Sequence, residues 1–427
     1  MKSKLSKSEK AWCMYDWANS SFVTTIVAAV LPVYFASVVC NTDTPTLNIF
    51  GMHFVSNSQS LWGYAMSIAA LFVALTSPFF GAIADAGTKR KLFLAILTIL
   101  GVISSALLFF SKEGLVTYTI LIVILGQIGF AGANTFYNSL LVFVTPPSRR
   151  NLISSRGYAW GYLGGGLLLA LNLLMIKKPG FFGIPEGTLP VRLSFLSVAV
   201  WWSLFSIPIF KHVKEKANLT TEKSFSLKRG FAEIYATLVN FRQHKNALRF
   251  LLSFLLYNDG IQTIIMMATI FGKAELNLGS GHLIGALLLT QFIGFPSAIL
   301  YGKLATRTGA KKSILWGIAG YIIIILYAWQ MTEAWQFWVL ASAVGLLQGG
   351  VQAISRSFYS NLIPQDKASE YFGFFAISSK FASILGPLLF AVIGDITGST
   401  RNSILSIVIF FILGGLLLLT VKEPKNA

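Results

Sequence analysis

Long apolar stretches, each about the length that crosses a lipid bilayer, recur along the whole chain with short polar breaks between them. A spanning helix needs about 20 mostly apolar residues. Twelve stretches meet this length, at residues 12–38, 60–84, 92–111, 116–144, 152–176, 190–210, 248–272, 282–303, 313–331, 335–362, 368–396 and 402–421. The pattern therefore predicts an all-α integral membrane protein with twelve transmembrane helices.

The composition excludes an ordinary soluble enzyme. The chain has 427 residues, of which 55% are hydrophobic and 12% charged, whereas soluble domains carry about 25% charged residues. A water-soluble fold of this size has too little interior to bury so much apolar surface. The lipid bilayer is therefore the first expected partner.

The net charge of +18 could indicate nucleic-acid binding, but the placement of the basic residues argues against it. With the N-terminus inside, 27 of the 34 lysines and arginines fall on the inner side, and one, Lys380, falls within a segment. The other six lie outside, at Lys112, Lys177, Lys178, Arg192, Lys273 and Arg401. Because positive loops stay in the cytoplasm, we predict cytoplasmic N- and C-termini and no nucleic-acid partner.

Parts of the first half of the chain recur in the second half. GAIADAGTKRK at 81–91 matches GKLATRTGAKK at 302–312, FYNSLL matches FYSNLI, and YDWANSS matches YNDGIQT, always in corresponding segments. Internal duplication of this kind is typical of transporters. It predicts two pseudo-symmetric six-helix bundles, residues 1–211 and 248–427. Between them, residues 212–247 form a cytoplasmic linker, with apolar residues at helical spacing that predict an amphipathic helix on the inner leaflet.

GAIADAGTKRK resembles the signature of the major facilitator superfamily between its second and third helices. The resemblance implies the major facilitator fold, in which this motif holds the two halves together on the cytoplasmic side. The corresponding cytoplasmic-gate residues here are Gly81, Asp85, Lys89, Arg90 and Lys91. Thr88 stands where the superfamily usually has glycine, so Gly87 is the candidate for a left-handed turn. In the second copy Thr306 replaces the acid, which implies a weaker contact there.

Two further motifs narrow the resemblance. W-x-x-Y-D-W-A-N-S-x-F at 12–22 and Y-N-D-G-I-Q-T-I at 257–264 resemble the autophagy-related vacuolar amino-acid effluxers and their bacterial relatives. The resemblance implies a secondary active transporter that moves a small polar solute, such as an amino acid or a similar zwitterion, and that works as an exporter. It also implies a location in a bacterial inner (plasma) membrane. We expect a monomer without a cofactor.

Two charges lie near the middle of predicted helices, where an ionised side chain costs roughly 2.5–3.5 kcal/mol on insertion scales. Asp259 lies in the seventh segment, with Tyr257, Asn258 and Gln262 around it, and Lys380 lies in the eleventh. They could form a structural ion pair with each other. Alternatively, Asp259 carries a proton and Lys380 binds a substrate carboxylate.

Other polar residues are candidates for a central substrate site. Asp16 and Asn19 share a face of the first segment, where Asp16 either lines a cavity and carries a proton or is an acid favoured by the helix dipole. Arg356, at the inner end of the tenth segment, is either a site residue or an ordinary positive-inside residue. The remaining candidates are Asn134, Asn138 and Gln352.

Three other functional classes remain alternatives to an amino-acid transporter. A membrane enzyme is disfavoured, because the four histidines lie in loops, and neither a metal-ligand motif nor a nucleotide-binding motif is present. A receptor or scaffold with a transporter fold stays open. So does a transporter of sugars, peptides or metal chelates. We expect no catalytic residues and no metal site.

Overall fold

The computed structural model describes residues 4–42, 45–49, 52–215, 244–382 and 384–423. Within these ranges, twelve helical spans are long and apolar enough to cross a membrane, which confirms the predicted number. The amphipathic helix predicted in the linker falls within 216–243 and lies outside the described residues.

The first six spans contain helices that pack into one bundle, the N-terminal half. Their bounds are α1 Lys7–Ser21, η1 Phe22–Val30, α2 Leu31–Tyr34, η2 Phe35–Val39, α3 Ser58–Ala86, α4 Arg90–Leu107, η3 Leu108–Phe110, α5 Val116–Ser139, α6 Leu141–Val144, η4 Pro147–Arg149, α7 Arg150–Lys177, η5 Pro179–Phe182 and α8 Leu189–His212. The first span is continuous from α1 to η2 and includes two π-helical stretches, η1 and η2.

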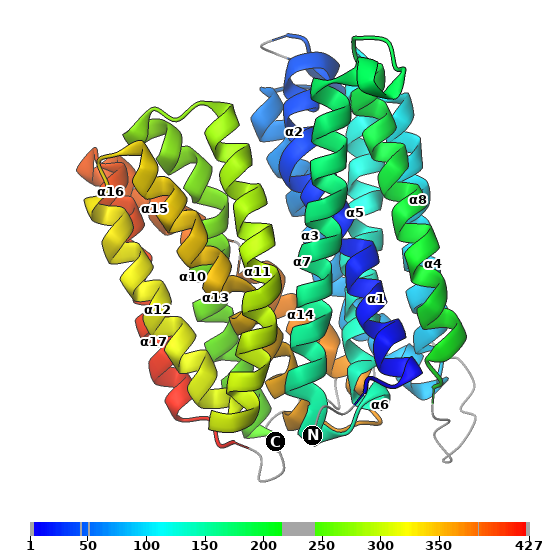
Figure 1. Ribbon diagram of the computed structural model, residues 1–427, viewed down its shortest axis with the longest axis vertical. Helices are drawn as coiled ribbons and strands as arrows, with labels where there is room; N and C mark the ends of the chain where they lie inside the picture. The colour runs from blue at the N-terminus through cyan, green and yellow to red at the C-terminus, as the bar shows by residue number, and fades with distance from the viewer. Residues whose placement is uncertain (1–3, 43–44, 50–51, 216–243, 383, 424–427) are drawn as a thin grey trace.

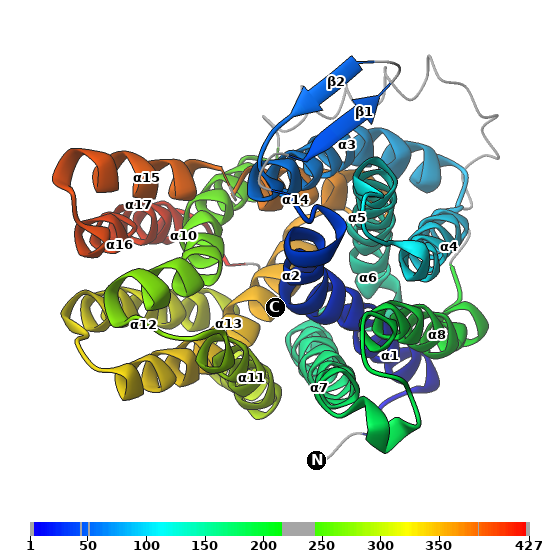
Figure 2. The same ribbon diagram turned by 90° about the horizontal axis from the view of Figure 1, so that it is seen from above.

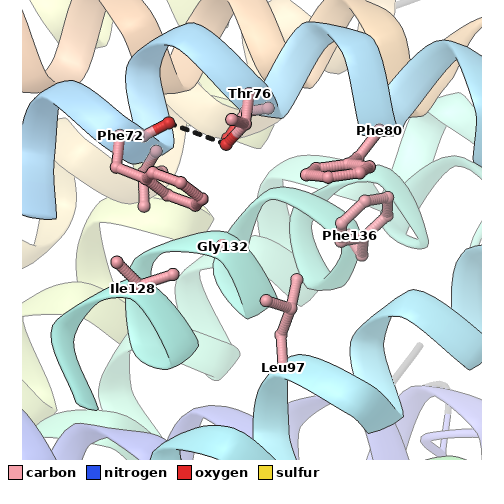
Figure 3. A pocket seen from close by; sticks show the side chains of 9 residues that line it. Phe72, Thr76, Phe80, Leu97, Ile128, Gly132 and Phe136 are labelled. Atoms are coloured by element: carbon pink, nitrogen blue, oxygen red, sulfur yellow. Dashed lines mark hydrogen bonds between the residues drawn. The ribbon is translucent and has the colours of Figure 1, made fainter. Parts of the chain in front are cut away.

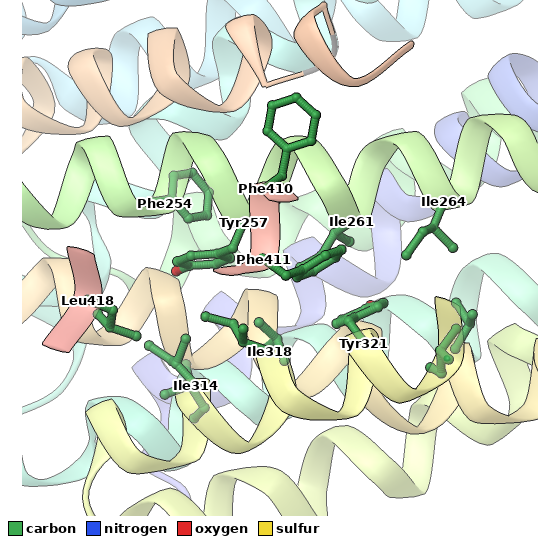
Figure 4. Packing of buried hydrophobic residues seen from close by; sticks show 14 of the residues in the cluster. Phe254, Tyr257, Ile261, Ile264, Ile314, Ile318, Tyr321, Phe410, Phe411 and Leu418 are labelled. Atoms are coloured by element: carbon green, nitrogen blue, oxygen red, sulfur yellow. The ribbon is translucent and has the colours of Figure 1, made fainter. Parts of the chain in front are cut away.

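The last six spans form the C-terminal half. Their bounds are α10 Lys245–Leu276, α11 Ser280–Thr308, α12 Ala310–Gln330, α13 Ala334–Leu362, α14 Ala368–Phe381, α15 Leu385–Thr397, α16 Thr400–Ser406 and α17 Val408–Leu419. Figure 4 shows how α10, α12 and α17 pack through Tyr257, Ile318, Tyr321 and Phe411. The rings of Tyr321 and Phe411 stack with their centroids 5.2 Å apart.

The two halves stand side by side as separate bundles (Figure 1 and Figure 2). We call the end where α1 begins and α17 ends the basal end, at the bottom of Figure 1, and the other end the apical end. The halves approach each other at the basal end and diverge toward the apical end. Between them, α7 packs against α11 and α13, and α3 packs against α14.

Two local features differ from the sequence prediction. The eleventh span was expected to be one helix over 368–396, but it is broken between Phe381 and Leu385 into α14 and α15. An antiparallel hairpin of β1 (Thr46–Ile49) and β2 (Met52–Val55) lies in the first apical loop, where an all-α chain predicts none. The hairpin is formed by backbone pairing between two four-residue strands in a loop. The apolar pattern of the membrane spans does not predict such pairing.

Candidate functional site

Arg356 of α13 extends from the C-terminal half into the N-terminal half near the basal end. Its guanidinium lies over three rings, with centroids at 4.6 Å for Trp12, 5.4 Å for Tyr137 and 4.4 Å for Tyr158. Its Nη2 lies 3.2 Å from Oδ2 of Asp16. The side chain is only 3% exposed, so the charge is removed from solvent and lipid and is balanced by Asp16 across the two halves.

Arg356 also donates hydrogen bonds to α5 and α7. Its Nη1 donates to Oδ1 of Asn138 at 3.1 Å. Its Nε donates to Oγ of Ser154 at 2.9 Å, and its Nη2 donates to the carbonyl oxygen of Ser154, also at 2.9 Å. All of these partners belong to the N-terminal half. This one side chain therefore joins the halves through charge, hydrogen bonds and ring contacts.

Arg150 at the start of α7 makes a second contact between the halves. Its Nη1 donates to the carbonyl oxygen of Ser360 at 2.8 Å and to Oδ1 of Asn361 at 2.9 Å, close to the C-terminal end of α13. Cations are favoured at the C-terminal end of a helix, where carbonyl groups lack partners within the helix. One turn earlier in α13, the hydroxyl of Ser357 donates to Oδ1 of Asn151 at 2.7 Å.

Asp85 makes the third contact, between α3 and α14. Its Oδ1 accepts from Nε of Arg90 at 2.6 Å and from the backbone N–H of Ser369 at 3.1 Å, while its Oδ2 accepts from the N–H of Glu370 at 2.9 Å. Ser369 and Glu370 lie in the first turn of α14. The carboxylate therefore occupies the N-terminal end of that helix, where unpaired N–H groups and the helix dipole favour an anion.

Gly81 allows α3 and α14 to approach. A Cβ at this position would overlap the backbone carbonyl of Ser369, and real Cβ contacts of this kind do not occur. Arg90 adds a bond from Nη2 to the carbonyl oxygen of Asp366 at 3.0 Å. Gly81, Asp85 and Arg90 of the N-terminal half thus all contact the segment at the start of α14; that they act as a gate stays a prediction.

The other two predicted gate residues lie elsewhere. Lys89 is exposed. Lys91 stays within the N-terminal half, where its Nζ donates to the carbonyl oxygen of Phe210 at 2.8 Å. The left-handed residue of this turn is Thr88, with φ of 50°. Gly87, which was expected to supply the turn, has φ of −96°, so that expectation was wrong.

Asp259 is fully buried inside the C-terminal half. Its Oδ1 accepts from the backbone N–H of Gly386 at 2.9 Å, in the first turn of α15 just beyond the helix break. Its Oδ2 and the hydroxyl of Thr263 one turn later have no hydrogen-bond partner among the described residues. A Cβ on Gly386 would overlap the side chain of Thr263 and lie close to Asp259, so the missing side chain lets this helix end approach the carboxylate.

Lys380 forms no ion pair with Asp259 or with any other acid in the described part of the chain. It lies two turns beyond Gly373 in α14, and Gly373 abuts the backbone of Ser77 and Pro78 in α3. Residues seven apart share a helix face. The half-buried Lys380 is therefore on the face of α14 that meets the N-terminal half, further from the basal end.

The remaining predicted residues divide between the halves. Asn19 donates to Oδ1 of Asn134 at 2.8 Å within the N-terminal half. Tyr257 and Ser355 share a hydrogen bond of 2.6 Å within the C-terminal half. Asn258 is buried, and its Nδ2 has no partner among the described residues. Gln262 and Gln352 are half-buried. Asn138 alone of this group bonds across the halves, through Arg356.

Sequence reasoning missed three residues around Arg356, namely Ser154, Tyr158 and Gly157. Tyr158 and Ser154 occupy the first turns of α7, and no motif singles them out. Trp12 and Tyr137 were within quoted motifs but were not assigned to the site. The sequence signal that could have found them is helical spacing, because Ser154 and Tyr158 are one turn apart on the same face of the helix.

A crevice between α3, α4 and α5 is apolar (Figure 3). It is lined by Phe72, Val73, Thr76, Ser77, Phe80, Leu97, Ile128, Gly132 and Phe136. None of the predicted polar site residues lines it. Within the described residues, no group of three or more His, Cys, Asp and Glu could hold a metal ion, and Cys13 and Cys40 are both free and buried.

Comparison with known proteins agrees with this architecture. Residues 6–427 match the family described as "Vacuole effluxer Atg22 like". The chain is 36% identical to the "Uncharacterized MFS-type transporter YxiO" of Bacillus subtilis, covering all of this chain and 97% of that protein. It is 25% identical to the autophagy-related protein 22 of Vanderwaltozyma polyspora, covering 96% and 89% of the two chains.

A solved structure shows the same fold. The Major Facilitator Superfamily transporter FucP of E. coli superposes with a TM-score of 0.69 at 13% identity, covering 98% of this chain and 99% of that one. These relatives are named as transporters and not as enzymes. The twelve spans in two bundles and the match over nearly the whole length together place this chain in the Atg22-like family of the major facilitator superfamily.

Proposed function

We propose that this protein is a secondary active transporter that exports an amino acid or a similar small zwitterion by alternating access, with a proton as the coupling ion. It works as a monomer in a bacterial inner membrane with both termini in the cytoplasm. A membrane transporter with a small-molecule substrate follows from the family. The substrate class, the direction and the coupling ion are the proposal.

The observation that carries the proposal is a pair of opposite charges inside the membrane that do not neutralise each other. Asp259 keeps one carboxylate oxygen without a hydrogen-bond partner among the described residues, and Lys380 is two turns beyond Gly373, which contacts α3 of the other half. A charge in the bilayer is retained at a cost and usually serves function. A zwitterion brings one group of each sign and so complements such a pair.

Alternating access is supported by where the halves touch. Arg356, Arg150 and Asp85 join them at the basal end, and the bundles diverge toward the apical end (Figure 1). With the basal end in the cytoplasm, this is an outward-facing state. The opposite state requires these three contacts to separate while the apical ends approach.

Proton coupling is assigned to Asp259, with Asp16 as the second candidate. An isolated carboxylate that is wholly buried is stable when it is neutral or when a cation accompanies it. Asp16 already has Arg356 beside it at 3.2 Å, whereas Asp259 forms no salt bridge among the described residues and accepts from the N–H of Gly386. Export is supported by the effluxer description of the family and by no residue of the site.

Counterflow into proteoliposomes tests the proposal. Labelled L-amino acids would be compared with their decarboxylated and deaminated analogues, which each lack one charge. We expect exchange of the zwitterions only, a loss of at least tenfold for Lys380→Gln, and normal exchange for Lys312→Gln, an exposed lysine at the basal end. Asp259→Asn should exchange without responding to a pH gradient. Binding without counterflow would identify a receptor, and transport of sugars alone would overturn the substrate class.

A further inference from the structure

The residues around Arg356 make a pocket that belongs wholly to the N-terminal half. Trp12 and Asp16 come from α1, Tyr137 from α5 and Tyr158 from α7. Aromatic faces around a carboxylate are the usual chemistry for binding an organic cation, because the ring faces and the acid both attract positive charge. We call these four residues the cage.

The cage is held together without Arg356. The indole Nε1 of Trp12 donates to the carbonyl oxygen of Tyr137 at 3.0 Å, and the two rings stack 4.5 Å apart. The hydroxyl of Tyr137 donates to Oδ2 of Asp16 at 2.7 Å. These bonds fix the orientation of two ring faces and of the carboxylate within one half. Separation of the halves therefore removes the guanidinium and leaves the walls in place.

Gly157 forms the floor of the cage. A Cβ there would lie about 2.5 Å from Oδ2 of Asp16, 2.9 Å from the ring of Trp12 and 3.1 Å from Nη2 of Arg356. Any larger residue would occupy the space that the guanidinium now fills. The absence of a side chain at this position is thus part of the fit for a cationic group.

We propose that the cage is a binding site for an ammonium or guanidinium head group of the transported solute, and that Arg356 fills it when the halves are closed at the basal end. The assignment rests on the proposed alternating-access function and deepens it. In the state open at the basal end, Arg356 withdraws with α13 and the solute's cationic group takes its place. Return of Arg356 then displaces the solute, so one side chain both closes the basal end and empties the site.

The first test uses Arg356→Ala, which vacates the cage, and ethylguanidinium, which replaces the deleted atoms. We expect low-millimolar ethylguanidinium chloride to raise the Tm of the purified full-length variant in a saturable way, with sodium chloride having no such effect. Arg150→Ala is the matched control, because it removes another arginine that joins the halves at the basal end but that lies over no aromatic ring of the described residues. The response should also disappear when Asp16→Asn is added to Arg356→Ala.

The second test needs no variant of Arg356. Spin labels at Lys211→Cys in α8 and Lys312→Cys in α12, both exposed at the basal end, report the distance between the halves, and the two native cysteines are buried. Ethylguanidinium should at least halve the population with the short distance, and Gly157→Ala should abolish this response. Equal Tm shifts in the two arginine variants, or an unchanged distance distribution with intact Gly157, would overturn the assignment. Zwitterion exchange would then stand without the cage.

Discussion

The two copies of the loop that follows the second span of each half, 81–91 and 302–312, share one architecture but differ at the interface. In the first copy, Glu215 accepts from the backbone N–H of Lys91 at 2.6 Å, and Lys91 reaches the end of α8. In the second, Glu423 accepts from the N–H of Ala310 at 2.7 Å, and Lys311 reaches the end of α17. Each half thus anchors its loop to its own last helix.

The contacts between halves break this symmetry. Asp85 binds the N-terminal end of α14 in the opposite half. Thr306 is exposed, and among the described residues its hydroxyl bonds to the carbonyl oxygen of Gly302 in its own helix and to nothing in the opposite half. On that side the opposite half supplies Ser155, against which Gly302 packs closely. Duplication therefore preserved the scaffold, while the carboxylate that binds a helix end of the opposite half is present in the first copy and replaced by threonine in the second.

The largest expected effect comes from Gly81→Ala. Its Cβ would meet the backbone of Ser369, which cannot rotate away as a side chain would. Overpacking of this kind costs about 1–3 kcal/mol, which lowers the ratio of closed to open molecules by roughly five- to 150-fold. The spin-label pair at positions 211 and 312 measures this directly.

Gly63→Ala in the same helix is the matched control, since nothing lies within 4 Å of a Cβ there. It should leave the distance distribution unchanged. If the Gly81→Ala variant shows the same closed population as the Gly63→Ala variant, the close approach of α3 to α14 does not limit closure of the halves.

The next largest effect distinguishes the two copies of the loop, through substitutions at the matching positions Asp85 and Thr306. Asp85→Asn keeps an acceptor but removes its charge, so it weakens the two hydrogen bonds to the end of α14; we expect this to cost about 1–1.5 kcal/mol of closure, the difference between a charged and a neutral acceptor. Thr306→Ala should change the closed population less than twofold, because its hydroxyl bonds only within its own helix. Similar effects for the two variants in the spin-label distances would mean that the gate is symmetric after all.

The sequence predicted the twelve spans because apolar length alone determines them, and it predicted the region of Asp85 because the motif is local. It did not predict the partner of Arg356, since Asp16 is 340 positions away and only packing of the halves brings them together. The break in the eleventh span was also missed. Asp259 caps α15 across 127 positions, a contact that no local pattern predicts, whereas Gly386 and Pro387 in the first turn of α15 are a local signal for a helix boundary that the apolar pattern overrode.

The smallest expected effect concerns the turn itself. Thr88 holds φ of 50°, while Gly309 at the matching position of the second copy holds φ of 96°. A left-handed conformation costs a residue with a Cβ about 1–2 kcal/mol, and part of this is offset by the greater freedom of glycine in the unfolded chain. Thr88→Gly should therefore stabilise the protein by about 0.5 kcal/mol, seen as a small rise in Tm. Gly87→Ala should leave Tm unchanged because the φ of Gly87 suits alanine. A fall in Tm for Gly87→Ala, with no rise for Thr88→Gly, would mean that Gly87 and not Thr88 holds the left-handed conformation.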